Sequence, residues 1–320
     1  MGRFLFKSLL ERAVLLVLVS IMAHAVVHLA PGEPSEVDPN NPRMKPEDIE
    51  RIRAAFHLDA PIHKQYFMWI RDLATGELRS FKDNQPVLAK IWDRFGNSLP
   101  LFACATLITW TLAFPVGIRG AVGRGLRFDR GSTLIAYLLI SMPGFFFAYV
   151  LIVLAAEHLQ LPVLGVNTFG LEGGPLLNRT MDRLWHLAIP ATISALTGVA
   201  LLSRYVRSQM LEVLGEDYLR AADARGLTRT TVIYRHGLRN ALLPAITLFG
   251  LMLPGLVGGS VIVEQIFAWP GIGRLGFEAI LARDFPVILT LNFFAAILTL
   301  SGTLLSDLLY AVADPRIRLP

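Results

Sequence analysis

The chain has 320 residues, of which 53% are hydrophobic and only 17% charged, with a net charge of +5. Its mean hydropathy is +0.51. A typical soluble domain carries about 25% charged residues, so the composition excludes an ordinary soluble protein. The single cysteine, Cys104, lies in an apolar run and is expected to pack within a helix, which excludes a disulfide framework and a CxxC metal site. An all-α integral membrane protein is the fold class that this composition predicts.

Stretches free of Asp, Glu, Lys and Arg locate the expected membrane spans, because a helix needs about 20 apolar residues to cross a ~30 Å hydrocarbon core. Six stretches are long enough, and each predicts one span. They are Ala13–Gly32, Phe95–Ile118, Gly131–Ala156, Leu184–Ser203, Asn240–Val263 and Phe285–Ser306.

The basic residues predict the orientation of these spans. An even number of spans puts both termini on one side, together with Arg119–Arg130 and Arg204–Arg239, and these regions hold 16 Lys and Arg. The short loops of the other side, Glu157–Arg183 and Glu264–Asp284, hold only 4, while the long loop Glu33–Arg94 balances ten basic against eleven acidic residues. Because cytoplasmic loops are enriched in Lys and Arg, both termini are predicted to be cytoplasmic.

The first span has some features of a secretory signal, since Ala23-His24-Ala25 resembles a cleavage site. Its apolar run is longer than the 7–15 residues that are typical of a signal peptide. An uncleaved first helix is therefore expected. The chain then divides into this helix (residues 1–32), an extracytoplasmic loop (33–94) and a core of five further spans (95–320).

Three amphipathic helices are predicted in the extracytoplasmic loop. Apolar residues recur at helical spacing in each of them. The first carries Ile49, Ile52 and Phe56 after Pro46, the second carries Ile62, Tyr66, Trp69, Ile70 and Leu73, and the third carries Val87, Leu88, Ile91, Trp92 and Phe95. They either lie on the outer leaflet, as aromatic-rich amphipathic helices do, or form a small folded cap.

Small residues and proline gather in the fifth span. Such residues allow close helix packing, and proline bends a membrane helix. The span is therefore either a packing seam or a moving, pore-lining helix. The residues in question are Gly250, Pro254, Gly255, Gly258 and Gly259.

Few polar side chains are expected at membrane depth, where ionisable groups are candidates for function. His24 and His28 share one face of the first helix and could be ligands, although a pair alone does not define a metal site. Asp307 lies one turn from the cytoplasmic end of the last span, so a structural or interfacial role is expected for it. Ser141, Ser194 and Ser260 are isolated and are expected to pack between helices.

The segment between the fourth and fifth spans, Arg204–Asn240, carries the clearest functional signal. A helix is predicted to extend the fourth span to about Leu214. A short helix is predicted over Asp217–Ala224, with acids at its start and Arg225-Gly226 at its end, and a third from about Thr230 leads into the fifth span. A short helix between two membrane-rooted helices would act as a rigid handle for an external partner.

This segment resembles the EAA loop of ABC importer permeases, in the form found in the first membrane subunit of dipeptide and oligopeptide importers. The similarity lies in Asp217–Leu227 and Arg235–Pro244. The motifs Phe267–Arg274, Arg283–Val287, Asp307–Tyr310 and Asp314–Arg318 match the same family in order. Arg220-Ala221-Ala222 stands where the general pattern has Glu-Ala-Ala, and Asp223 replaces a basic or neutral residue.

The resemblance implies a type I permease fold that works by alternating access in a bacterial or archaeal plasma membrane. It implies that the short helix docks in a cleft of an ATPase subunit, with Gly226 in a turn that requires a positive φ. The implied contact residues are Glu216, Asp217, Tyr218, Ala221, Ala222, Ala224, Arg225, Gly226 and Leu227, and those of the loop-to-helix motif are Arg239, Asn240 and Pro244.

The resemblance also implies the partners: a second related permease subunit, two ATPase subunits and an extracytoplasmic substrate-binding protein. The chain contains no GxxxxGK[ST] loop to hold ATP phosphates. It is therefore expected to be no enzyme and to bind no cofactor itself, with ATP used by the partner subunits. Peptides are the expected cargo, and nickel complexes, glutathione or another small solute are the alternatives.

Two other classes of membrane protein fit the sequence less well. An ion-coupled secondary transporter would need coupling ligands near the midplane and would favour inverted repeats, and neither is seen in the sequence. An intramembrane enzyme such as a protease would need a Ser/His, paired Asp or HExxH constellation at membrane depth. The six spans carry none of these.

Overall fold

The computed structural model describes residues 2–29, 50, 53, 58–159, 164–168, 170, 174–258 and 261–313. Helices dominate this part of the chain, and its one isolated antiparallel bridge pairs Arg79 with Pro86. The α-helices are α1 (Gly2–Leu29), α3 (Ile62–Thr75), α4 (Val87–Val122), α5 (Arg127–Ser141), α6 (Gly144–Leu154), α7 (Leu176–Leu214), α8 (Asp217–Ala224), α9 (Leu238–Ala241), α10 (Leu243–Met252), α11 (Gly255–Gly258), α12 (Val261–Ile266), α13 (Ile272–Leu281) and α14 (Phe285–Ala313). Two π-helical segments, η2 (Ala155–Leu159) and η3 (Thr231–Gly237), complete the list.

The membrane-spanning part largely follows the prediction. Five helical stretches among the described residues are long and apolar enough to cross a membrane, and a bent pair brings the number to six if it counts as one span. The five stretches are Phe6–Leu29, Val87–Val122, Leu176–Leu214, Pro244–Ile266 and Phe285–Val312. The all-α membrane fold is therefore confirmed.

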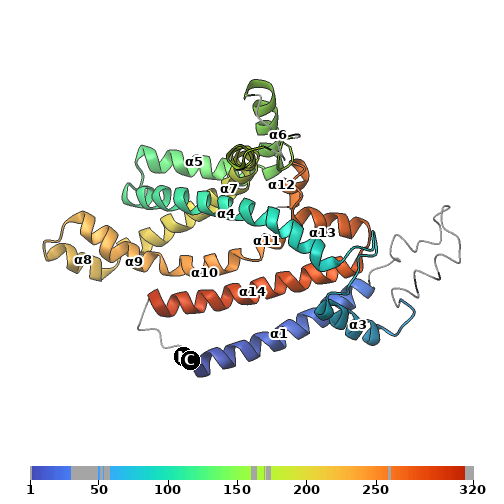
Figure 1. Ribbon diagram of the computed structural model, residues 1–320. Helices are drawn as coiled ribbons and strands as arrows, with labels where there is room; N and C mark the ends of the chain where they lie inside the picture. The colour runs from blue at the N-terminus through green and yellow to red at the C-terminus, as the bar shows by residue number, and fades with distance from the viewer. Residues whose placement is uncertain are drawn as a thin grey trace.

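The third expected span departs from a single helix. It consists of α5 and α6, whose axes meet at 99°. Helix α6 projects upward in Figure 1, and its Ala148 is buried against Ile193 of α7 and Phe267. Pro143 causes the break, because a residue before proline is driven out of the α region. Met142 accordingly has φ −100° and ψ 137°. The absence of charge over Gly131–Ala156 correctly predicted an apolar segment, but it did not predict that the helix is broken at Pro143.

Helices α4 and α7 form the most closely packed pair of the bundle, and small residues allow their approach. A side chain at Gly117 would meet the Ser203 carbonyl oxygen at 2.6 Å, and one at Gly198 would meet the Thr109 hydroxyl at 2.9 Å. Any larger residue at these two glycines would push the helices apart.

A second close contact joins α10 to α14. A Cβ atom on Gly250 would collide with the backbone of Gly302, and one on Gly302 would collide with the backbone of Gly250. This contact is the packing seam that the small residues of the fifth span allow. Pro254 lies between α10 and α11, where the helix is interrupted. Gly259 and Ser260 lie outside the described residues.

The described part of the long loop is a folded cap. Trp69, Val87 and Ile91 are buried in one cluster with Ile272 of α13 and Val287 of α14. The second and third predicted amphipathic helices are therefore present as α3 and the start of α4, and they pack on the protein. The first, with Ile49, Ile52 and Phe56, lies outside the described residues, as does the Asp314–Arg318 motif.

Helix α1 lies at the edge of the bundle beside α14 (Figure 1). Arg12 forms an ion pair of 2.7 Å with Asp307, and its Nε donates to the Leu300 carbonyl oxygen at 3.2 Å. Near the other end of α1, the hydroxyls of Ser20 and Tyr66 are 2.8 Å apart. Asp307 thus has the structural role that its position predicted.

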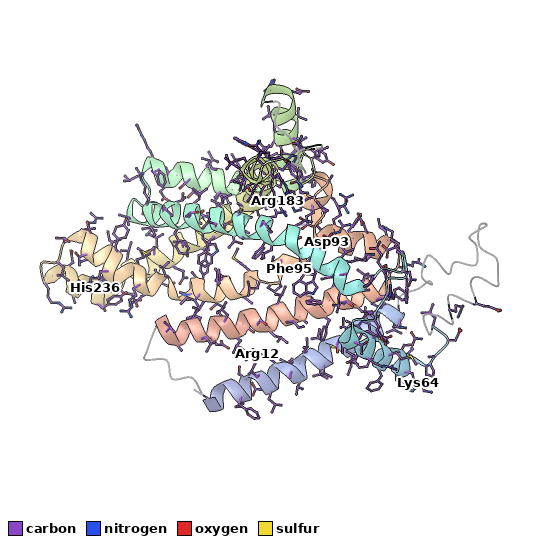
Figure 2. All side chains as sticks on the ribbon, viewed as in Figure 1. Arg12, Lys64, Asp93, Phe95, Arg183 and His236 are labelled. Carbon is purple, nitrogen blue, oxygen red and sulfur yellow. The ribbon has the colours of Figure 1, made fainter. Side chains whose placement is uncertain are left out.

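The bundle has two distinct ends (Figure 1). Helix α8, the start of α1 and the end of α14 lie at one end, and α3 and α13 lie at the other. We call these the α8 end and the α3 end. In Figure 2, His236 marks the α8 end and Lys64 the α3 end.

Candidate functional site

Helix α8 is stabilised by packing against its neighbours, because it is too short to be stable alone. Isolated helices shorter than about 12 residues are marginal in water, and α8 has 8 residues. Its Leu219 and Ala222, three apart, are buried against Val232 of η3 and the last turn of α7. A Cβ atom at Gly237 would lie 3.5 Å from Leu219, at ordinary van der Waals distance, so η3 and α8 are in close contact at this point. The short helix is therefore clamped between the ends of two long helical segments.

The opposite face of α8 is open to solvent. The Asp217 and Arg220 side chains are 95% and 72% exposed, and they form an ion pair of 3.2 Å. Of the residues implied as contacts, only Ala222 is buried. The exposed ones are Glu216, Asp217, Tyr218, Ala221, Ala224, Arg225, Gly226 and Leu227. The helix thus offers a surface of charged and small side chains on a fixed base.

The turn after α8 depends on glycine. Gly226 has φ +77°, in the left-handed region that other residues rarely adopt, and its amide donates to the Asp223 carbonyl oxygen at 2.9 Å. The expected positive φ at Gly226 is therefore confirmed. Nothing lies within 4 Å of a Cβ atom built at Gly226, so the backbone conformation and not space sets the requirement.

One side-chain link joins α8 to the helix that follows the loop. The Asn240 amide donates to the Tyr218 hydroxyl at 2.8 Å, and that hydroxyl lies 3.5 Å from the His236 carbonyl oxygen. Arg239 is exposed beside this link, and Pro244 occupies the first turn of α10, where its missing amide hydrogen does no harm. The loop-to-helix motif therefore lies directly against α8.

The base of the loop is continuous with the core of the bundle. Val206 and Met210 of α7 are buried together with Ile233 of η3, Ala241 of α9 and Ala113 of α4. The end of α7 that α8 packs against is thus also part of the packed core formed with α4 and α9.

Arginines of α7 hold α5 at the same end. Arg207 makes a bidentate contact with Asp129, at 2.5 and 2.8 Å. Arg204 donates to the hydroxyls of Thr133 and Tyr137 and lies over the Tyr137 ring. Two of the basic residues that predicted orientation therefore also bind α5 to the bundle.

Two protein-family models cover nearly all of the chain. Residues 113–319 match the binding-protein-dependent transport system inner membrane component family, and residues 1–102 match the N-terminal region of such membrane components. The chain belongs to this family. It is a multi-pass permease subunit of a binding-protein-dependent ABC importer, as the motifs predicted.

Similar proteins extend the match over the full length. The chain is 35% identical to the oligopeptide transport system permease protein AppB of Bacillus subtilis (strain 168), with 99% of each chain covered. It is 36% identical to the dipeptide transport system permease protein DppB of Escherichia coli (strain K12), with 94% of each covered. A putative peptide transport system permease protein of Brucella abortus (strain 2308) is 36% identical over 99% of both chains.

At the α3 end of this permease, a buried carboxylate organises the Phe267–Arg274 motif. Glu264 is fully buried, accepts from the Ser98 hydroxyl at 2.8 Å and from the Arg274 amide at 2.8 Å. The Ser98 hydroxyl in turn accepts from the Ile272 amide at 2.8 Å. These bonds join the Phe267–Arg274 motif to Ser98 of α4 through the buried Glu264. Sequence reasoning read Glu264 only as the end of a span.

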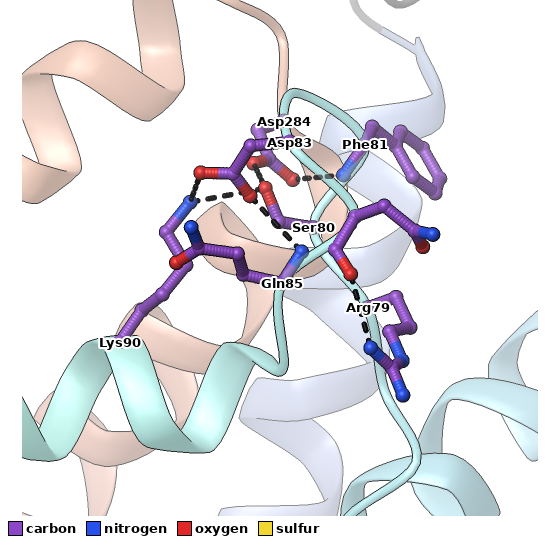
Figure 3. A network of polar contacts seen from close by, with 8 residues as sticks. Arg79, Ser80, Phe81, Asp83, Gln85, Lys90 and Asp284 are labelled. Carbon is purple, nitrogen blue, oxygen red and sulfur yellow. Dashed lines mark hydrogen bonds and ion pairs between the residues drawn. The ribbon is translucent and has the colours of Figure 1, made fainter.

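A second buried carboxylate, Asp284, fixes the start of α14 (Figure 3). It accepts from the Ser80 hydroxyl and from the Phe81 amide, the latter at 3.0 Å. Lys90 bridges Ser80 at 3.1 Å and Asp83 at 2.8 Å. Burial raises the pKa of Asp83, but the hydrogen bonds from Lys90 and the Gln85 amide outweigh it, so this pKa lies below its usual value. The cap and α14 are thus joined through charge-assisted bonds.

The two histidines of α1 lie at the contact between α1 and α3. His24 Nε2 is 3.3 Å from the Ile62 carbonyl oxygen, and His28 Nε2 is 2.9 Å from the Gln65 side-chain oxygen. Within the described part of the chain, no group of three or more His, Cys, Asp or Glu side chains could hold a metal ion. These contacts give both histidines a structural role in the packing of α1 against α3.

Proposed function

We propose that this permease forms half of the translocation pathway of an ATP-driven peptide importer. One observation carries the proposal: three proteins named as peptide, dipeptide or oligopeptide permeases match the chain at 35–36% identity over nearly its whole length. Nickel complexes, glutathione and other small solutes are the alternative cargoes, and nothing in the chain favours them.

We also propose that α8 receives the force of ATP hydrolysis. Its exposed face would dock in a cleft of an ATPase subunit, and its buried face would pass the movement to α4, α7 and α10. The solvent exposure of Asp217, Ala221 and Arg225 supports the first step. The packing of Leu219 and of Met210 supports the second, because closely packed side chains transmit displacement.

If this chain forms half of the pathway and hydrolyses no ATP itself, the importer needs further subunits. A second related permease would complete the pathway, two ATPase subunits would bind the ATP, and an extracytoplasmic binding protein would deliver the cargo. The excess of basic residues at the α8 end supports a cytoplasmic position for α8 and both termini. The purified chain alone is expected to bind no ATP.

The test is uptake into proteoliposomes that contain the complete importer, made from this chain, its second permease and its two ATPases, with the binding protein added outside. Labelled di- and tripeptides are expected to accumulate only when ATP is enclosed. Omission of this chain should abolish uptake. Accumulation of a nickel complex or glutathione, with no uptake of any peptide, would contradict the proposed cargo.

A further inference from the structure

A pocket opens between the start of α7 and the start of α4, at the α3 end. Its volume is about 440 Å³, within the range of small-ligand sites. Arg179, Thr180 and Arg183 of α7 line one wall, and Asn167 and the apolar residues Pro100 and Trp269 line the rest. Arg183 is labelled in Figure 2.

Two guanidinium groups share this pocket. Arg179 and Arg183 are four apart on α7, so they are neighbours on one face of the helix and repel each other. Arg183 donates to the Asn97 side-chain oxygen at 3.0 Å. This bond uses one N–H donor of its guanidinium group and leaves the others for a ligand. Within the described residues, no side chain or carbonyl accepts a hydrogen bond from Arg179. The pocket lies at the N-terminus of α7, where the helix dipole adds positive potential.

The one acid of the wall is already engaged by the neighbouring loop. Asp182 accepts from the Thr168 amide at 2.8 Å and from the Thr168 hydroxyl at 2.6 Å, and it lies 3.6 Å from His186. Its charge is therefore committed to holding residues 164–168 in place. An additional anion in the pocket would relieve the repulsion between the two arginines.

We propose that this pocket is a carboxylate subsite for the solute that the permease transports. A carboxylate there would accept charge-assisted hydrogen bonds from Arg179 and Arg183, whose forked geometry suits it. Pro100, Leu184 and Leu187 would face the apolar part of the same molecule. This inference rests on the proposed function, because it places an anionic cargo at the outer mouth of the pathway.

The shape of the site favours a small solute over an acidic side chain of a docked protein. The pocket is concave, with an apolar floor formed by the fully buried Trp269, whose indole nitrogen donates to the Asn97 carbonyl oxygen at 3.0 Å. That bond and the Arg183–Asn97 bond tie the site to the Phe267–Arg274 motif. A solute bound in the pocket would thus affect the position of the loop that Glu264 fixes.

The test compares two probes, trialanine and trialanine amide, which differ by the carboxylate charge but not by length. Uptake of each is measured in the complete reconstituted importer, and the acid-to-amide ratio of the rates is calculated. The same binding protein serves every variant, so its own preference cancels when ratios are compared. Arg179→Gln is expected to lower this ratio about tenfold, as the loss of a hydrogen bond to a charged group predicts. Arg179→Lys should lose less.

The matched control is Arg71→Gln, which removes the same charge from the exposed surface of α3 and should leave the ratio unchanged. An unchanged ratio in Arg179→Gln, with both probes still transported, would overturn the subsite. So would weaker docking of the substrate-free binding protein to Arg179→Gln without a change in the ratio, since Arg179 would then contact that protein. Failure of the unmodified importer to transport either probe would instead refute the peptide cargo, and the subsite with it.

Discussion

The two buried carboxylates of the α3 end contrast with the charged side chains on the outward face of helix α8. At the α3 end, Glu264 and Asp284 are buried and surrounded by hydrogen-bond donors. At the α8 end, the side chains of Asp217 and Arg220 are 95% and 72% exposed. A buried charge fixes geometry, because removal of its partners leaves an unpaired group that costs folding free energy. An exposed charge contributes little to stability and stays available to a partner.

Charged residues therefore serve opposite purposes at the buried carboxylates and on the outward face of α8. The α3 end is locked by contacts that join distant parts of the chain, such as Ser80 with Asp284 and Ser98 with Glu264. The outward face of α8 carries short-range contacts, such as Arg225 with the Ala221 carbonyl oxygen. Mutations of the buried carboxylates should therefore affect folding, and mutations on the outward face of α8 should affect coupling.

The largest effect is expected from Glu264→Leu. The change leaves the Ser98 hydroxyl and the Arg274 amide without their acceptor. Each orphaned donor costs about 1–3 kcal/mol, so the free energy of unfolding should fall by about 2–6 kcal/mol. Thermal unfolding of the purified subunit in detergent measures this loss.

The control for that prediction is Glu278→Leu, four residues from Arg274 on α13. Glu278 forms an ion pair of 2.9 Å with Arg274, and both side chains are 31% exposed. A partly exposed pair contributes at most about 1 kcal/mol. Equal losses of stability in the two variants would show that the buried carboxylate does not lock the α3 end.

A smaller effect, and one of a different kind, is expected from Gly226→Val. A β-branched residue at φ +77° is strained by about 1–3 kcal/mol, which should displace the turn after α8. Transport per ATP hydrolysed should fall about tenfold, while membrane insertion and the amount of protein stay normal. Uptake and ATP hydrolysis, measured together in proteoliposomes, report this ratio.

Gly125→Val is the matched control, because it introduces the same backbone strain at a different turn. Gly125 has φ +79° in the turn before α5, with nothing within 4 Å of a Cβ atom, as at Gly226. Its replacement should cost similar stability but leave transport per ATP unchanged. If both variants lowered that ratio equally, the defect would come from general strain and not from the contact surface of α8.

The sequence predicted those features that local chemistry determines. Helix α8 has the predicted bounds, Asp217–Ala224, because acids at its start and Arg225-Gly226 at its end favour termination there. The bend at Pro143 could have been predicted as well, but the count of charge-free residues ignores backbone geometry. The roles of the α8 contact residues stay predictions, since an exposed surface alone does not identify what binds it.

Long-range pairings were beyond prediction from one sequence. Ser98 and Glu264 are 166 residues apart, and no period or spacing connects them. In the sequence, Arg179 and Arg183 stand out only as the two basic residues of a short loop. Their pocket could not be predicted, because the wall that faces them comes from α4 and from Trp269. Such contacts depend on how the helices pack, and the packing is decided by many side chains at once.

The smallest effect is expected from Tyr218→Phe, which removes the hydroxyl that accepts from Asn240 at 2.8 Å. The phenyl ring stays, so α8 should keep its place. A single hydrogen bond contributes about 0.5–1.5 kcal/mol, so transport per ATP should fall about threefold to tenfold with little change in thermal stability. The reason is that the link joins α8 directly to the helix that enters the fifth span.

Tyr234→Phe is the matched control, because Tyr234 is also exposed and lies in η3 without a hydrogen-bond partner for its hydroxyl among the described residues. It should transport as the unmodified chain does. Asn240→Ala should reproduce the defect of Tyr218→Phe, and the double variant should be no worse than either single one, since both remove the same bond. Additive defects would mean that Tyr218 and Asn240 act independently of each other, and that the bond between them has no part in coupling.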